Sequence, residues 1–152
     1  MKVLAIDPHI NKQYAIALFD DHTLVNLGYA ELHVVELLVN LADHVYIEDQ
    51  YFGKNNNTMK KLAQSSGKVI GLCELHDTAY TLVHPATWQS RAGIKLKKKK
   101  DMKQSEWVKY KANEYIRAAE LIVGDEKLKI ENDDFAVAII MAWAMGVEGD
   151  RT

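Results

Sequence analysis

Lys2-Val3-Leu4-Ala5-Ile6-Asp7 is the stretch of sequence that decides the predicted fold. After Lys2 it is an unbroken apolar run, which is typical of a strand buried on both faces in the middle of an α/β sheet. The run ends at Asp7, and Pro8 cannot extend a central ladder. A carboxylate at the end of a buried strand is unfavourable unless a cation or hydrogen-bond donors satisfy it. Asp7 is therefore either a turn residue that ends the strand or part of a site.

The pattern on either side of this strand predicts an α/β protein. Strands are expected at residues 2–7, 14–19, 24–32, 44–48 and 79–83. Helices are expected at 34–42, 58–76, 87–92 and 133–145, and a long one is expected over a segment that includes 108–122. Short loops join the first three strands, which predicts an antiparallel meander. The remaining strands alternate with helices.

Length and composition exclude several classes of protein. The 152 residues, with 48% hydrophobic and 26% charged side chains, are those of one soluble globular domain spanning 1–152. Cys73 is the only cysteine, so there is no disulfide framework and no thiolate zinc site, and a reducing cytoplasm is expected. The six histidines show no metal-ligand spacing and are treated as ordinary. The sequence has neither an apolar run of roughly 20 residues nor a signal-peptide pattern, so no membrane association is expected.

The net charge of −2 conceals a strongly basic segment. Residues 91–111 carry a net +7, whereas 1–90 carry −4 and 112–152 carry −5. The basic residues of the segment are Arg91, Lys95, Lys97, Lys98, Lys99, Lys100, Lys103, Lys109 and Lys111. An acidic body with one basic segment suggests a polyanion held at one place. The alternative is a solvated lysine-rich loop.

Acidic residues lie at the ends of three apolar elements. Asp7 and Glu48 end strands, and the cluster Glu131-Asn132-Asp133-Asp134 precedes the last helix. If the two strands are adjacent and parallel, both acids lie at one edge of the sheet, where sites form in open α/β sheets. Converging carboxylates can hold Mg²⁺, and a pair of such ions can activate water for phosphodiester cleavage. Taken singly, each acid is a helix cap or a surface charge.

Three segments and the final helix resemble the RuvC-type Holliday-junction resolvases, especially phage-encoded ones, of the RNase H-like nuclease superfamily. They are Val3-Leu4-Ala5-Ile6-Asp7-Pro8, Ile47-Glu48-Asp49-Gln50-Tyr51-Phe52-Gly53-Lys54-Asn55 and His84-Pro85-Ala86-Thr87-Trp88, followed by residues 136–142. The order matches over nearly the whole chain, and the second segment is the most specific.

This resemblance implies an RNase H-like fold with a five-stranded mixed sheet, three antiparallel strands followed by parallel strands, flanked by helices. It implies cleavage of branched DNA, above all four-way junctions, by a homodimer that uses Mg²⁺, with Mn²⁺ also possible, in a bacterial or phage-infected cytoplasm.

The resemblance also implies roles for single residues. Asp7 and Glu48 are then metal ligands, and Lys103 roughly matches a family lysine near the scissile phosphate. Tyr51 matches a position that carries an aromatic near the junction bases, where stacking contributes roughly 1–3 kcal/mol per base; a core role under the next helix is the alternative. The expected DNA-binding residues are Tyr51, Lys54, Arg91, Lys97, Lys98, Lys99, Lys100 and Lys103.

The chain departs from the family at two places. His9-Ile10-Asn11 follows Asp7-Pro8 where the family often has a small, glycine-containing turn. In the last helix, Val137 stands where the second aspartate of Asp-x-x-Asp-Ala belongs if Asp134 is the first. In the other register Glu131 and Asp134 are the pair, so Asp134 is a ligand in both, and Glu131 is its expected partner. Asp133 points about 100° away and is expected to cap the helix.

These observations favour a structure-specific endonuclease that resolves Holliday junctions by paired nicks. The alternatives are a less selective branched-DNA or flap nuclease of the same fold, and a junction-binding protein disabled by Val137. An actin-like phosphotransferase fragment would need a second domain and another glycine-rich phosphate loop. A two-fold junction calls for a C2 dimer, and the helix over 58–76 is its expected interface because Gly67 and Gly71 permit close approach.

Overall fold

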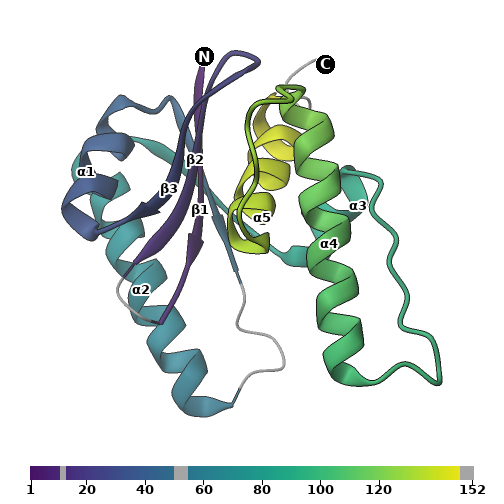
Figure 1. The fold of residues 1–152 in the computed structure, drawn as a ribbon. Helices are drawn as coiled ribbons and strands as arrows, with labels where there is room; N and C mark the ends of the chain where they lie inside the picture. The colour runs from purple at the N-terminus through teal and green to yellow at the C-terminus, as the bar shows by residue number, and fades with distance from the viewer. Residues whose placement is uncertain (11–12, 50–54, 148–152) are drawn as a thin grey trace.

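The computed structural model describes residues 1–10, 13–49 and 55–147. Five strands form one mixed sheet in the order β3-β2-β1-β4-β5, with β1 at its centre (Figure 1). β1 (Lys2–Pro8) pairs antiparallel with β2 (Tyr14–Asp20), which pairs antiparallel with β3 (Thr23–Ala30). On its other side β1 pairs parallel with β4 (His44–Glu48), which pairs parallel with β5 (Ala79–Val83). The predicted mixed sheet is therefore confirmed.

In the described residues, five α-helices follow or connect the strands: α1 (Leu32–Leu41), α2 (Asn56–Leu75), α3 (Pro85–Arg91), α4 (Gln104–Val123) and α5 (Asp133–Ala142). Some bounds differ from the prediction. β3 ends at Ala30 rather than at residue 32, because Leu32 already begins α1. α3 begins at Pro85 rather than at 87, since proline suits the first turn of a helix and His84 caps it. The predicted last helix ends as α-helix at Ala142 and continues as a π-helical turn, Trp143–Val147.

Helices cover both faces of the sheet, which explains the unbroken apolar run of β1. Leu4 and Ile6 point into the core beneath α1 and α2. Val3 and Ala5 point to the opposite face, where they pack in the core that contains α5. Figure 1 shows α1 and α2 on one side of the sheet and α3, α4 and α5 on the other. Alternating side chains of the same strand therefore enter two separate cores.

α5 is apolar on nearly all sides because it lies between the sheet and α4. All its residues from Phe135 to Ala142 are buried. At the π-helical turn, a Cβ on Gly146 would come within 2.5 Å of Val3 Cγ1 and 2.9 Å of Tyr46 Cε2. Only glycine allows the backbone to approach the sheet this closely. The turn that follows α5 is thereby held against the start of β1. None of the helices in the described part of the chain is long and apolar enough to cross a membrane.

Candidate functional site

Two carboxylates lie side by side at the carboxyl edge of the sheet. β1 and β4 are parallel neighbours in which Ile6 pairs with Ile47, so the next residues along are Asp7 and Glu48. Both side chains are buried, with only 3% and 5% of the residue exposed. The two strands are thus adjacent and parallel, which is the condition under which the sequence places both acids at one edge of the sheet.

The N-terminus of α5 adds two further acids. Asp133 and Asp134 occupy its first turn, where the helix dipole favours negative charge. The prediction that Asp133 caps this helix is wrong, because Asn132 is the cap: its side-chain oxygen accepts from the Phe135 backbone amide at 2.9 Å. Asp134 Oδ2 accepts a 2.7 Å hydrogen bond from the Tyr29 hydroxyl of β3. Asp133 is therefore available to the cavity described next.

A cavity of about 490 Å³ opens in front of these acids. β1, β4 and α5 supply its acidic wall, and α3 and α4 supply the opposite wall. The lining residues are Asp7, His9, Glu48, Asp49, His84, Pro85, Trp88, Gln89, Lys111, Tyr115, Asp133, Asp134 and Val137. Four of the acids that sequence analysis singled out, Asp7, Glu48, Asp133 and Asp134, thus share one cavity.

α3 orients Glu48. The Trp88 indole donates a 2.6 Å hydrogen bond from Nε1 to Glu48 Oε2, and the Trp88 side chain is buried. The Trp88 ring packs edge-on against Tyr115 of α4, with 5.5 Å between ring centroids. Gln89 Nε2 donates to the Tyr115 hydroxyl at 3.1 Å. The segment that contains Trp88 is part of the family resemblance, but the sequence predicts no role for the indole, because a contact across 40 positions has no local signal.

His9 is a further site residue that the sequence pattern did not indicate. Its Nε2 lies 3.5 Å from Asp7 Oδ2 and 3.7 Å from Asp134 Oδ2. The three side chains can present ligand atoms that all lie within 4.8 Å of one another. Histidine spacing along the sequence could not reveal this group, because Asp134 lies on a different element. The one available signal was that His9 replaces the small turn residue expected after Asp7-Pro8.

The pKa shifts describe a site with excess negative charge. Burial raises the pKa of Asp7, and the charges of Asp134 and Asp133 raise it further, while His9 opposes the shift. The Asp7 carboxylate in turn raises the pKa of His9, although burial of the imidazole opposes this. Burial and the hydrogen bond to Asp134 raise the pKa of Tyr29 to about 12, so this phenol stays a donor. A cation bound here would relieve the repulsion between the carboxylates.

Other expected site residues lie apart from this cavity. Glu131 is exposed and does not line it, whereas Val137, one turn into α5, does. Lys103 is exposed at the N-cap position of α4, two turns before the cavity. The lysine that lines the cavity is Lys111, which is partly buried with its Nζ 5.3 Å from the centre of the Trp107 ring. Lys103 and Lys111 lie about two helical turns apart, so the helical period alone does not show which of them reaches the cavity. The position of α4 against the sheet decides it.

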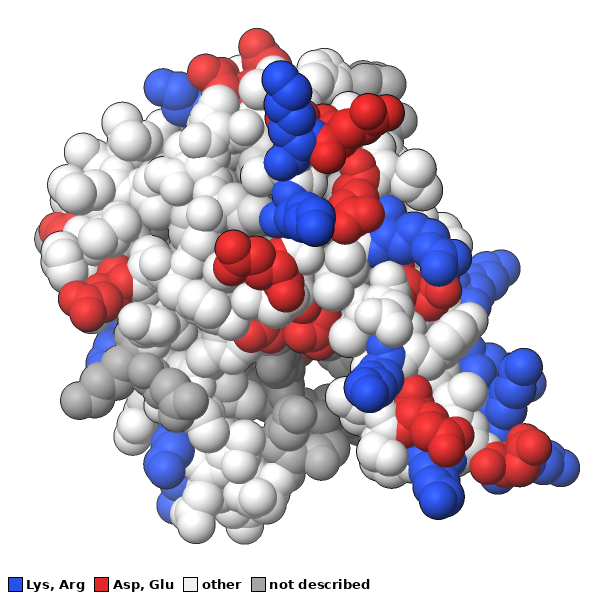
Figure 2. All heavy atoms as spheres, viewed as in Figure 1, with Lys and Arg blue, Asp and Glu red and all other residues white. Residues whose placement is uncertain are grey.

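The basic residues of the connection between α3 and α4 are exposed. They are Lys95, Lys97, Lys98, Lys99, Lys100 and Lys103, and Arg91 at the end of α3 is exposed as well. Figure 2 shows lysine and arginine side chains gathered over α4 and the connection that precedes it. Tyr51 and Lys54 lie outside the described residues.

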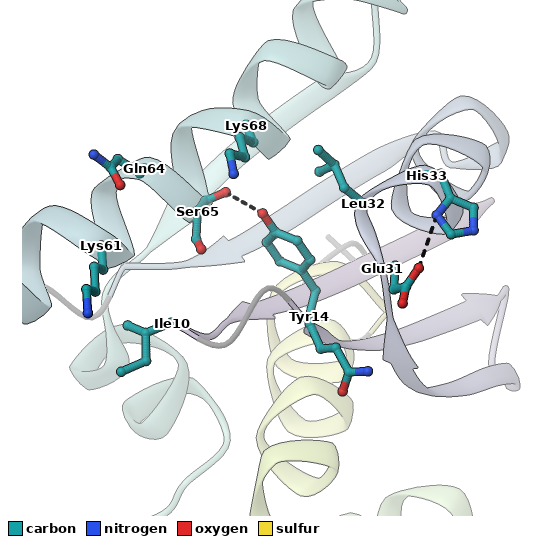
Figure 3. Close-up of a pocket in the computed structure, with 10 residues that line it drawn as sticks. Ile10, Tyr14, Glu31, Leu32, His33, Lys61, Gln64, Ser65 and Lys68 are labelled. Atoms are coloured by element: carbon teal, nitrogen blue, oxygen red, sulfur yellow. Dashed lines mark hydrogen bonds and ion pairs between the residues drawn. The ribbon is translucent and has the colours of Figure 1, made fainter.

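A second cavity, of about 730 Å³, lies between α2 and the start of α1 (Figure 3). Its charged lining residues are Glu31, His33, Lys61 and Lys68, and Glu31 pairs with His33 at 3.5 Å. Tyr14 donates from its hydroxyl to the Ser65 carbonyl at 3.0 Å across this cavity. It contains none of the acids at the sheet edge, so the smaller cavity is the candidate site.

No protein-family profile matches the chain, and a search of curated proteins finds no similar sequence. Solved structures do match. One is RuvC from Thermus thermophilus, with a TM-score of 0.70 and 14% sequence identity over 98% of this chain and 95% of that one. Another is T. thermophilus RuvC in complex with Holliday junction substrate, with a TM-score of 0.68 and 14% identity over 97% of this chain and 98% of that one. The chain therefore has the RuvC fold, in agreement with the resemblance seen in the sequence.

Proposed function

We propose that the protein is a metal-dependent, structure-specific endonuclease that cleaves branched DNA, and that it resolves four-way junctions by paired nicks. The observation that carries the proposal is the convergence of Asp7, Glu48 and Asp134 from three elements on one cavity. Burying carboxylates together is unfavourable without a cation, because they are desolvated and repel one another. A purely structural role for these acids does not explain that cost, whereas ion binding does. The fold is that of a protein solved with a Holliday junction, which supports the choice of substrate.

The donor set fits a hard divalent cation. Asp7, Glu48 and Asp134 would hold the ion, and Asp133 lines the same cavity. Mg²⁺ takes oxygen ligands and few from protein, so three or four carboxylates suffice. A bound ion of this kind supplies an activated water and charge stabilisation for the leaving oxygen in phosphodiester hydrolysis.

Residues on the opposite wall would bind the reacting strand. Lys111 lines the cavity and offers a positive charge for the scissile phosphate. Trp88 holds Glu48 in place through its 2.6 Å hydrogen bond, so it positions a ligand. Lys103 and the lysines at 97–100 lie before α4 and would bind phosphates of the junction arms without reading sequence.

A second function is favoured by one observation. Val137 places an apolar side chain in the acidic cavity, where a further carboxylate would strengthen ion binding. A site weakened in this way could leave a protein that binds junctions without cutting them. Both proteins would bind the junction, and only the nuclease would release cleaved strands.

The deciding experiment incubates the protein with a synthetic four-way junction, a flap and a linear duplex of matched sequence, with Mg²⁺ or Mn²⁺. Paired, symmetric nicks in the junction and an intact duplex are expected, and Asp7→Asn should bind the junction without cutting it. Equal cleavage of junction and flap would identify the less selective nuclease. Tight junction binding with no cleavage in either ion would identify the binding protein.

A further inference from the structure

The turn after β1 places an imidazole between two of the proposed ligands. His9 Nε2 lies 3.5 Å from Asp7 Oδ2 and 3.7 Å from Asp134 Oδ2. Two atoms bound to one octahedral ion at about 2.1 Å lie about 3 Å apart when adjacent and about 4 Å apart when opposite. The observed separations fall between these values. A single ion could therefore contact all three atoms after small side-chain movements.

The nitrogen that faces the carboxylates is buried and makes no hydrogen bond among the residues that the structure describes, so its polar contacts are the two charge pairs with Asp7 and Asp134. Buried polar atoms in this state are rare in folded proteins, and binding of an ion is one way in which they are satisfied. The imidazole edge also packs against Tyr29, with 6.3 Å between ring centroids. Tyr29 itself donates to Asp134, so the same neighbours orient the imidazole and the carboxylate.

The backbone of the turn is held from α2. Ser65 Oγ donates to the His9 carbonyl at 2.9 Å, and the Ser65 carbonyl accepts from the Tyr14 hydroxyl at 3.0 Å. Figure 3 shows Ser65 of α2 directed toward Tyr14 of β2. The position of His9 is thus set by contacts outside the acidic cluster, as expected of a preorganised ligand.

Building on the proposed metal-dependent function, we propose that His9 is itself a ligand of the cation and makes the site prefer Mn²⁺ to Mg²⁺. Imidazole nitrogen is an ordinary ligand for first-row transition-metal ions, whereas Mg²⁺ selects oxygen. His9 supplies the additional donor that Val137 does not. The ligand set is then Asp7, His9, Glu48 and Asp134.

The test measures ion binding to the whole protein without DNA. Dissociation constants for Mn²⁺ and Mg²⁺ come from titration calorimetry, and electron spin-echo spectroscopy of bound Mn²⁺ detects coupling to a ligand nitrogen. Wild type should show nitrogen coupling. His9→Gln should abolish the coupling and lower the preference for Mn²⁺ over Mg²⁺ by roughly tenfold. His9→Asp should also abolish the coupling while restoring Mg²⁺ affinity, because it offers oxygen.

His22→Gln is the matched control, because His22 is exposed in the turn between β2 and β3. It should keep both the coupling and the ion preference, and melting curves check that every variant folds. Unchanged coupling and preference in His9→Gln would overturn the role of His9. In that case a loss of ion binding in Asp7→Asn would still support the proposed metal centre. Wild type that binds neither ion would overturn both proposals.

Discussion

At the scale of one residue, Asp7 is needed for the proposed ion binding but destabilises the metal-free protein. Its carboxylate is 3% exposed, and burial together with the charges of Asp134 and Asp133 raises its pKa. In the unfolded chain an aspartate ionises near a pKa of about 3.9. Because the folded value is higher, ionised Asp7 destabilises the metal-free protein. The stabilising contribution of the protonated form is present below the unfolded pKa and is lost as pH rises through the folded pKa.

Asp7→Asn should therefore raise the stability of the metal-free protein at pH 7 while abolishing cleavage. We expect a gain of about 1 kcal/mol, or a melting temperature higher by about 3 °C. The difference should shrink as the pH approaches 4, where wild-type Asp7 also becomes neutral. Adding Mn²⁺ should reverse the order, since only the wild type gains stability from the ion. Calorimetric melting over pH 4–8, with and without the ion, measures this. A less stable variant at pH 7 without metal would contradict the argument.

Variants at Val137 and Glu131 distinguish the two possible ligand pairs, which are Asp134 with position 137 and Glu131 with Asp134. Val137 lines the cavity, whereas Glu131 is exposed and precedes the helix cap. Val137→Asp should therefore strengthen ion binding and raise the cleavage rate. It should also destabilise the metal-free protein by several kcal/mol, because a further charge is buried among acids. Glu131→Gln, the matched control, should leave both cleavage and ion affinity unchanged. A Glu131→Gln variant that lost cleavage and ion affinity would show that Glu131 is a ligand.

The connection between α3 and α4 is the element that carries most of the basic charge. Its lysines are exposed, and Lys98 donates to Gln104 at the start of α4 at 3.0 Å. This contact holds one end of the basic segment to the helix that also presents Lys111 to the cavity. A DNA strand whose phosphates bind along the connection would thus be directed toward the acidic cavity.

Replacing the four lysines at 97–100 with alanine should weaken binding to branched and linear DNA alike. Each lost phosphate contact should lower the slope of log K against log salt by roughly 0.9. Replacing Lys127 and Lys129, exposed on the connection between α4 and α5, serves as the control and should leave the slope unchanged. Fluorescence anisotropy over a range of salt concentrations measures both. An unaltered slope in the first variant would mean that the lysines are a solvated loop.

At the scale of the whole molecule, paired nicks in a two-fold junction require two active sites related by a dyad. α2 offers a surface for such a dimer. Gly67 and Gly71 are exposed, and a Cβ added at either would meet no atom within 4 Å. Each glycine costs a helix about 1 kcal/mol relative to alanine, and no close approach within the described chain explains that cost. A second α2 packed across these glycines would explain it.

We therefore predict a dimer by sedimentation at micromolar concentration. Changing Gly67 and Gly71 together to arginine should give monomers with an unchanged or higher melting temperature, because both positions have open space around them. The monomer should make single nicks rather than paired ones. A wild-type protein that stays monomeric with and without junction DNA would exclude this assembly.

The sequence alone was sufficient for the sheet and for part of the acidic site. β4 and β5 have the predicted bounds, and β1 ends one residue beyond the prediction. Apolar runs that stop at a charged residue or a proline are local signals, because burial of a strand depends on its own side chains. The same signals placed Asp7 and Glu48 at strand ends, and parallel pairing then brought them together.

Only the tertiary structure decided which residues complete the site. His9 meets Asp134, Trp88 meets Glu48, and Lys111 rather than Lys103 lines the cavity. These contacts join elements far apart in the sequence, so they depend on how α3, α4 and α5 pack on the sheet. The helix cap shows the same limit at short range, since Asn132 and Asp133 are both good capping residues. The local pattern leaves the two nearly equivalent, and the packing of α5 against the sheet selects Asn132 as the cap and turns Asp133 to the cavity.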